Sequence, residues 1–480
     1  MRLTSLLLAG LLACAPRAPA QPLPELGDAA GAAIAPQVER RIGESIVREI
    51  RYRDPAYVDD AEITDFLANL GRRLLSTIPD ARQEFEFFAL RDPAINAFAL
   101  PGGFVGVHTG LLTAAESESE LASVLAHEIA HVTQRHIARL IGAQQQMQLP
   151  SMVALAAAIL LGGSRPDLAA GAAVAAQGTM LQQQLSYTRD FEREADRIGF
   201  RTLQEAGFDV RAMPAFFEKM QRYSRLGDDG TVPSYLRTHP MTTERIADAQ
   251  GRAANAQYRQ HLDSLDFHLV RAKLRAESGE ARDAVAAFAA AVRERRYANE
   301  AAARYGLVTA RLRARQLPEA RIDLAALRAT GAASPMIETL AARVQQASGD
   351  AAGAVATLGA ALQRYPGRLP LIYAYAQSLH QAGRHPEALA TLGEPVRRHP
   401  EDPRLRALQA QTYAALGKRL LQHQAQAELY LLRGSVPAAI EQLQLARAAG
   451  DGNFYELSAV EARLKELRAR HAQDERDAKR

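Results

Sequence analysis

Two stretches near the start of the chain show the hydrophobic spacing of a surface helix. In Val38–Tyr52 and Asp60–Thr77, apolar residues recur every three or four positions, with Asp, Arg and Glu between them. This period collects the apolar side chains on one face of a helix. We therefore predict an amphipathic helix over each stretch.

A strand-like pattern follows in residues 83–112. Short runs of alternating, β-favouring residues are broken by Asp92-Pro93 and by Pro101-Gly102-Gly103. Because proline and glycine interrupt strands and favour turns, we predict two or three short strands with a turn at the second break. Residues 116–146 return to a helical pattern, and glutamates fill the first turn, where the helix dipole favours negative charge.

From about residue 262 the chain repeats itself. Glycine separates helical segments, alanine recurs where two helices would touch, and proline closes each unit, all with a period of 34 residues. This pattern is typical of tetratricopeptide repeats, whose stacked helix pairs form a solenoid with a concave binding groove. Residues 425–450 fit a last, divergent copy, and the charged residues 461–480 fit a solvated cap or a frayed end. The repeating positions include Gly349, Gly383, Gly417, Ala354, Ala388, Pro366 and Pro400.

Composition and charge narrow the class of protein. With 480 residues, 48% of them hydrophobic and 23% charged, the chain has the mix of a globular protein with more than one folded unit. The net charge is +4, but acidic and basic residues are interleaved, so nucleic acid is not an expected partner. Cys14 is the one cysteine, which excludes a cysteine-based zinc site. Any metal would be bound by histidine and carboxylate.

The first twenty residues have the pattern of an export signal. They combine a basic start, a short apolar run and an A-x-A ending at Ala18-Pro19-Ala20. We predict cleavage after Ala20 and a periplasmic mature protein. Because "LLAC" also resembles a lipobox, a lipoprotein anchored at Cys14 is the alternative. The most apolar later stretch, residues 152–163, is shorter than the roughly twenty residues that span a bilayer.

The most specific motif lies in residues 124–136, VLAHEIAHVTQRH, inside the predicted helix. A helix turns by about 100° per residue, so His127 and His131 lie on one face and can reach the same ion. Glu128 lies beside that face. In this H-E-x-x-H arrangement, zinc lowers the pKa of a bound water, and the glutamate accepts its proton as the water attacks a peptide carbonyl.

A third metal ligand has to come from elsewhere. The metzincin continuation is excluded, because Gln134 and Ile137 occupy its Gly and His positions. His136 falls on the opposite face of the predicted helix, so we expect it to be a solvated polar residue. Further along, Glu192 and Asp196 are one helical turn apart, so one could bind the ion while the other orients a ligating histidine. By themselves these carboxylates also fit a charged amphipathic helix.

The two motifs together resemble a known family. HEIAH followed at this distance by SYTRDFEREAD resembles the gluzincin metalloproteases of the HtpX and CAAX-protease type. An exported protease domain followed by tetratricopeptide repeats is similar to the BepA-like periplasmic proteases and chaperones, over essentially the whole mature chain. This resemblance implies one zinc ion per chain held by His127, His131 and Glu192, with Glu128 catalytic and Asp196 supporting a ligand.

The resemblance also implies roles for residues outside these motifs. Residues 96–107 resemble the family's strand beside the zinc, and an exposed edge there would bind extended substrate at Asn96, Gly103 and Val105. His239 corresponds to a loop histidine able to occupy the fourth zinc position and keep the enzyme latent. Arg245 corresponds to an arginine that faces the metal, where it could stabilise the oxyanion of the tetrahedral intermediate or form a structural ion pair.

The predicted architecture is mainly α. It consists of a signal peptide (1–20), an α+β zinc metallopeptidase domain with a small sheet (21–258) and an α-solenoid of tetratricopeptide repeats (259–480). Within the peptidase domain, the Ala/Gly-rich residues 152–178 fit a buried helical connection, or alternatively a flap or a surface for peripheral membrane contact.

These features predict a periplasmic zinc endopeptidase with chaperone-like activity. It would degrade or assist misfolded or stalled outer-membrane proteins and dock the assembly machinery through the repeat groove. The alternative is mainly a chaperone or adaptor whose proteolysis is rare or latent.

Overall fold

The structure is a computed structural model that describes residues 34–79, 83–143, 189–226 and 234–478. The predicted signal peptide, Cys14 and the Ala/Gly-rich residues 152–178 lie outside this part of the chain. Within the described residues, no helix combines the length and the apolar character needed to cross a bilayer.

Both predicted amphipathic helices are present, as α1 (Pro36–Arg53) and α2 (Ala61–Leu75). The Asp60 side chain caps α2 by accepting hydrogen bonds from two backbone N–H groups in the first turn. The apolar face of each helix is buried, including Ile46 and Ile50 in α1. The hydrophobic period therefore located these helices to within a few residues.

Three strands form the predicted small sheet: β1 (Glu86–Leu90), β2 (Ala97–Leu100) and β3 (Phe104–His108). Their order is β1-β3-β2, with β1 parallel and β2 antiparallel to β3. The predicted turn joins β2 to β3, and Gly103 adopts a φ of 99° there, where a Cβ would lie 2.1 Å from a backbone oxygen. Only glycine fits this position without strain.

The sheet order corrects one prediction about substrate binding. Val105 lies in β3, the central strand, which pairs with a neighbour on each side, and its side chain is fully buried. Gly103 lies in the turn that leads into β3. These two residues therefore do not lie on an exposed edge. The outer strands are β1 and β2, and within the described part of the chain β2, which directly follows Asn96, pairs only with β3.

Helix α4 (Glu118–Thr133) is the centre of this part of the molecule. Every residue from Glu118 to Val132 is buried, as expected for a helix surrounded on all sides. The short α3 (Thr109–Ala114) leads into it, and β2 and α8 (Arg189–Glu205) pack against it. At Gly199 of α8 a Cβ would come within 3.0 Å of the His127 backbone nitrogen, so this glycine allows the two helices to approach closely.

The remaining helices of this part are α5 (His136–Ala143), α9 (Ala212–Leu226), α10 (Ser234–Thr238) and α11 (Thr243–Asn255). Helices α9 and α11 pack against each other, and α11 also contacts α8. The loop between α10 and α11 is thereby brought next to α8.

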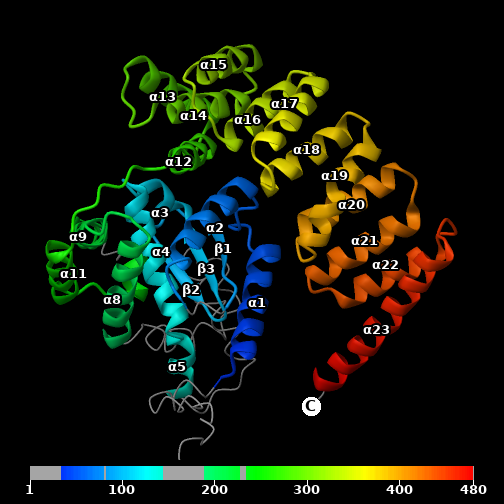
Figure 1. Cartoon of the computed structure of the whole chain (residues 1–480), viewed down its shortest axis with the longest axis horizontal. Helices are drawn as coiled ribbons and strands as arrows, with labels where there is room; N and C mark the ends of the chain where they lie inside the picture. Colours follow the sequence, from blue (N-terminus) through cyan, green and yellow to red (C-terminus); the bar gives the residue numbers. More distant parts are fainter. Residues whose placement is uncertain (1–33, 80–82, 144–188, 227–233, 479–480) are drawn as a thin grey trace, which may run out of the picture.

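Successive helix pairs form the C-terminal part and curve in an arc past the sheet-containing part (Figure 1). Gly349, Gly383 and Gly417 all have positive φ at the turn inside a pair, which explains their period. The predicted cap is a long last helix whose first half is packed on the preceding pair. The helices are α12 (Leu265–Glu277), α13 (Ala281–Arg293), α14 (Glu300–Arg313), α15 (Leu317–Ala329), α16 (Pro335–Ala347), α17 (Ala351–Arg364), α18 (Leu369–Gln381), α19 (His385–Arg398), α20 (Pro403–Ala415), α21 (Arg419–Leu432), α22 (Val436–Ala448) and α23 (Phe454–Ala478).

The two parts share a hydrophobic core. One buried cluster runs from α2 and the sheet through α4 into α12, α14 and α16. At this junction Lys273 of α12 is 3% exposed and forms ion pairs with Asp60 (2.5 Å) and Glu62 (2.6 Å) at the start of α2. The core thus crosses the predicted domain boundary at residue 258, and the boundary itself stays a prediction.

Candidate metal centre

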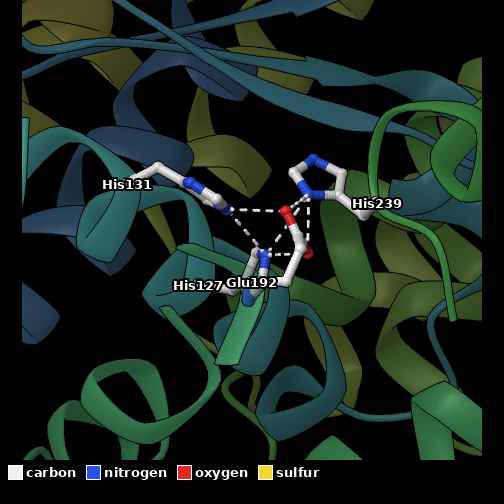
Figure 2. A group of neighbouring side chains, drawn as sticks. All are labelled: His127, His131, Glu192 and His239. Atoms are coloured by element: carbon white, nitrogen blue, oxygen red, sulfur yellow. Dashed lines mark hydrogen bonds and ion pairs between the residues drawn. The ribbon is translucent and has the colours of Figure 1, made fainter. Parts of the chain in front are cut away.

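Three elements bring the predicted site residues together. Helix α4 carries His127 and His131, and Figure 2 shows both rings directed at Glu192 of α8 and at His239 from the loop after α10. All four side chains are buried. The sequence motifs, separated by about sixty residues of chain, therefore meet in space with the loop histidine between them.

The spacing of the donor atoms fits a single ion. His131 Nε2 lies 3.0 Å from His127 Nε2 and 3.4 Å from a Glu192 carboxylate oxygen, and His239 Nδ1 lies 3.3 Å from His127 Nε2 and 3.0 Å from Glu192. Ligand atoms about 2.0–2.1 Å from a tetrahedral zinc are separated by about 3.3 Å. Three imidazole nitrogens and a carboxylate oxygen are also a donor set that suits zinc.

The electrostatics of the group favour a bound cation. Burial opposes a charge on His127, but hydrogen bonds to Asp196 and Glu192 outweigh it and raise the pKa of His127 to about 10. Burial alone would raise the pKa of Glu192, yet the neighbouring His239, His127 and His131 hold it well below its ordinary value. At His131, by contrast, burial outweighs the contact with Glu192 and lowers the pKa well below its ordinary value, so the pocket stabilises an ionised Glu192 and positive charge at His127 but not at His131.

Asp196 and Arg245 contact the donor group from outside, through His127 and Glu192. Asp196 lies 3.0 Å from His127 Nδ1, the ring nitrogen that faces away from the centre. Arg245 donates to both oxygens of Asp196 at 2.7 and 2.8 Å, to the Pro240 carbonyl at 2.8 Å, and pairs with Glu192 at 2.8 Å. With its guanidinium engaged in these bonds, Arg245 fits the ion-pair alternative better than the predicted oxyanion role.

Glu128 is fully buried beside the donor group. The Ala99 backbone contributes a hydrogen bond to its carboxylate, no side chain within the described residues donates one, and His239 Nε2 lies 3.4 Å from Oε1. Burial raises the pKa of Glu128, an effect that His239 and His127 partly offset. A buried carboxylate without side-chain donors is costly unless water or a ligand satisfies its remaining acceptor sites.

His136 departs from its predicted position. The structure buries it completely, with Nδ1 2.8 Å from His131 Nδ1, so the prediction of a solvated residue is wrong. The reason is a break in the helix: α4 ends at Thr133, Arg135 has a φ of 51°, and α5 begins at His136. The change of direction turns His136 back towards the site. No glycine or proline marks this break in the sequence.

The Arg135 side chain holds the unusual backbone in place. Its guanidinium donates to the Glu39 carboxylate at 2.8 Å and to the Ile34 carbonyl at 2.5 Å, both near the start of α1. Positive φ is uncommon for a residue with a Cβ and persists where surrounding contacts fix it. The N-terminal helix therefore helps to place His136.

Comparisons with known proteins identify the family of the chain. Residues 65–253 match the model of peptidase family M48, and residues 346–412 match a tetratricopeptide repeat model. The chain is 33% identical to the β-barrel assembly-enhancing protease of Escherichia coli over 458 residues, covering 94% of this chain and 92% of that protein.

Two other relatives match a shorter part of the chain. A putative β-barrel assembly-enhancing protease of Vibrio cholerae is 41% identical over 252 residues, 52% of this chain and 51% of its own length. The mitochondrial metalloendopeptidase OMA1 of Schizosaccharomyces pombe is 31% identical over 211 residues, 43% of this chain and 59% of its own. The chain therefore belongs to the metalloproteases of peptidase family M48, with tetratricopeptide repeats after the peptidase region, which confirms the predicted resemblance.

Proposed function

We propose that this metalloprotease is a zinc endopeptidase of the periplasm that cleaves unfolded or stalled outer-membrane proteins. The observation that carries this proposal is the buried group of His127, His131, Glu192 and His239, whose donor atoms all lie within 4.8 Å of one another. The E. coli relative, named a β-barrel assembly-enhancing protease, supports the class of substrate. The pattern of an export signal at residues 1–20 supports the location.

Each residue of the site has a proposed part in peptide hydrolysis. His127, His131 and Glu192 would hold the zinc, which supplies Lewis-acid activation of water and of the peptide carbonyl. Glu128 would accept the proton of the attacking water and pass it to the leaving amine. Its buried carboxylate, to which no side chain of the described residues donates a hydrogen bond, fits that task. Asp196 would fix the orientation of His127, and Arg245 would fix Asp196 and Glu192.

His239 is proposed as a fourth ligand that keeps the enzyme latent. His239 directly follows the short helix α10, and its Nδ1 belongs to the donor group. Its ring is stacked on that of Tyr235, with the ring centres 4.8 Å apart. A histidine in the fourth position would occupy the place that water and substrate need during catalysis. Movement of this loop would then open the site.

Replacing His239, the proposed latch of the metal site, should activate the enzyme. His239→Ala is expected to raise basal cleavage of unfolded casein roughly tenfold, the effect of a latch worth about 1.4 kcal/mol. Initial rates with a fluorescent casein measure this directly. His261→Ala is the matched control, because His261 is also paired with a carboxylate but lies outside the donor group. A rate equal to or below that of the unchanged protein would remove the regulatory role of His239.

Two surfaces support binding of extended or acidic partners. Strand β2 is an edge of the sheet and packs against α4, so a peptide added there would lie beside the donor group. A groove of about 710 Å³ is also lined by Arg91, which follows β1, and by residues of the repeats that include Arg315 and Arg343, with Glu277 as the one acidic residue of its lining. We propose that substrate or assembly machinery docks in the repeats, with acidic segments favoured in this groove.

A second function is supported by the same latch. With His239 in the fourth position, the resting protein would bind clients through its repeats and cleave rarely, which fits a chaperone or adaptor. The two functions differ in whether cleavage is needed for outer-membrane assembly. A lipoprotein form acylated at Cys14 is a separate alternative to cleavage after Ala20, and mass spectrometry of the mature N-terminus distinguishes them.

Metal removal tests the proposed activity. Treatment with 1,10-phenanthroline should abolish cleavage of a urea-unfolded outer-membrane β-barrel protein, and added zinc should restore it. The reason is that the proposed mechanism needs the zinc to activate the water and the peptide carbonyl. Gel densitometry of substrate over time is the measurement, with a serine protease as the control for effects of the chelator on the substrate. Cleavage that continues unchanged in the chelator would contradict a metal-dependent mechanism.

A further inference from the structure

The second ring nitrogen of His131 faces a histidine rather than a carboxylate. His131 Nε2 points to the donor group, and its Nδ1 lies 2.8 Å from His136 Nδ1. The opposite nitrogen of His136, Nε2, lies 3.2 Å from a Glu194 oxygen. We infer that His136 and Glu194 are positioning residues that fix the tautomer and orientation of His131. This inference rests on the proposed metal centre.

The chemistry of the three side chains fixes the direction of the hydrogen bonds. Nε2 of His131 needs its lone pair for a metal, so the ring proton is on Nδ1, and Nδ1–H donates to Nδ1 of His136. His136 then carries its own proton on Nε2, which donates to the Glu194 carboxylate, a pure acceptor. One consistent set of tautomers thus links the ligand to an anion through a second imidazole.

Contacts on several sides hold His136 in place. Its ring is fully buried and stacked on Phe191, with ring centres 4.6 Å apart and planes 9° from parallel. Arg139 donates to the same Glu194 oxygen at 2.9 Å and also lies over the Phe191 ring. The imidazole therefore has little freedom to rotate, which a positioning residue requires.

The arrangement explains how one helix supports both histidines of the motif. Asp196 of α8 contacts His127 directly, whereas Glu194 of the same helix reaches His131 through His136. The helix break before α5 supplies the intermediate ring. His136 is not itself a candidate ligand, because the donor group consists of His127, His131, Glu192 and His239.

Metal affinity is the direct test, since it does not depend on catalysis. His136→Phe keeps a flat ring for the stack on Phe191 but accepts no hydrogen bond, and we expect zinc affinity to fall by about 10–100-fold, as for other partners of ligating histidines. His136→Asn can place an amide oxygen near the position of Nδ1, so it should recover most of the affinity. Competition with a chromophoric zinc chelator measures the dissociation constant, and the visible spectrum of the cobalt-substituted protein reports the geometry.

The matched control is His261→Phe. His261 also pairs with a carboxylate at 3.2 Å, through Glu118, but lies away from the donor group, so its zinc affinity and cobalt spectrum should be unchanged. If His136→Phe does not fold, Glu194→Gln serves instead, because Glu194 is partly exposed and its loss should still weaken zinc binding about tenfold. Affinity within twofold of the unchanged protein and an unaltered cobalt spectrum in the folded variant would overturn the inference. Failure of the unchanged protein to bind zinc would instead refute the proposed metal centre.

Discussion

The Glu128→Gln protein is expected to fold and bind zinc like the unchanged protein while cleaving unfolded protein roughly a thousandfold more slowly, the loss typical of a missing general base. Glutamine has the size of glutamate but cannot accept the proton of the attacking water. Because no side chain within the described residues donates a hydrogen bond to Glu128, and a glutamine oxygen can still accept from the Ala99 backbone, the substitution should leave the fold intact. Initial cleavage rates, zinc content and circular dichroism measured together separate catalysis from folding.

Glu205→Gln is the control for the loss of one negative charge. Glu205 is exposed at the end of α8, so this variant should cleave at the normal rate. Cleavage by Glu128→Gln at the rate of the unchanged protein would contradict the proposed mechanism. The same variant separates the two proposed functions, because recovery of outer-membrane assembly in cells without any cleavage would favour the chaperone, and failure would favour the protease.

Replacing Glu192 by alanine should have the second largest effect. Glu192 supplies the anionic donor to the group and pairs with Arg245 at 2.8 Å, so Glu192→Ala removes a proposed ligand and leaves a buried guanidinium with one partner fewer. Loss of a residue that only hydrogen-bonds to a metal ligand lowers metal affinity by up to roughly a hundredfold. We expect Glu192→Ala to lower zinc affinity by more than this, and the rate of cleavage to fall with it. Equilibrium dialysis against buffered zinc measures the affinity.

Two further results make the Glu192 test specific. Glu205→Ala, on the same helix but exposed, should bind zinc as the unchanged protein does. Excess zinc should restore part of the activity of Glu192→Ala if the remaining imidazoles still hold the ion. Normal affinity in Glu192→Ala would show that this carboxylate is not a ligand.

The sequence predicted the regular elements well because they depend on local periodicity. The spacing of apolar residues located α1 and α2, and the 34-residue period located the repeats through Gly349, Gly383 and Gly417. Each of these features is fixed by neighbours in the chain, so it can be read without knowledge of the fold.

Predictions that depended on which face of a helix a residue occupies, or on the order of strands in the sheet, were less successful. The face assigned to His136 assumed one continuous helix, and the change of direction at Arg135 invalidated it. The family resemblance implied an exposed edge at Val105, and the sequence itself does not reveal which of the three strands is central. In both cases the deciding contacts come from distant residues, namely Glu39 for Arg135 and β1 for Val105.

The long-range part of the site came from the family resemblance. Spacing left Glu192 and Asp196 as alternatives, and either residue fitted a charged helix. The structure distinguishes them, because Glu192 lies within the donor group and Asp196 lies behind His127. The sequence also left two roles open for Arg245. Only its contacts with Asp196 and Pro240 in the structure distinguish an ion pair from an oxyanion donor.

X-ray absorption at the zinc edge of the purified full-length protein tests the central claim most directly. We predict about one zinc per chain, with only nitrogen and oxygen donors at about 2.0–2.1 Å and the scattering pattern of three imidazoles in the resting state. Absence of zinc, sulfur donors, or a first shell without two or more imidazoles would contradict a centre built from His127, His131, Glu192 and His239.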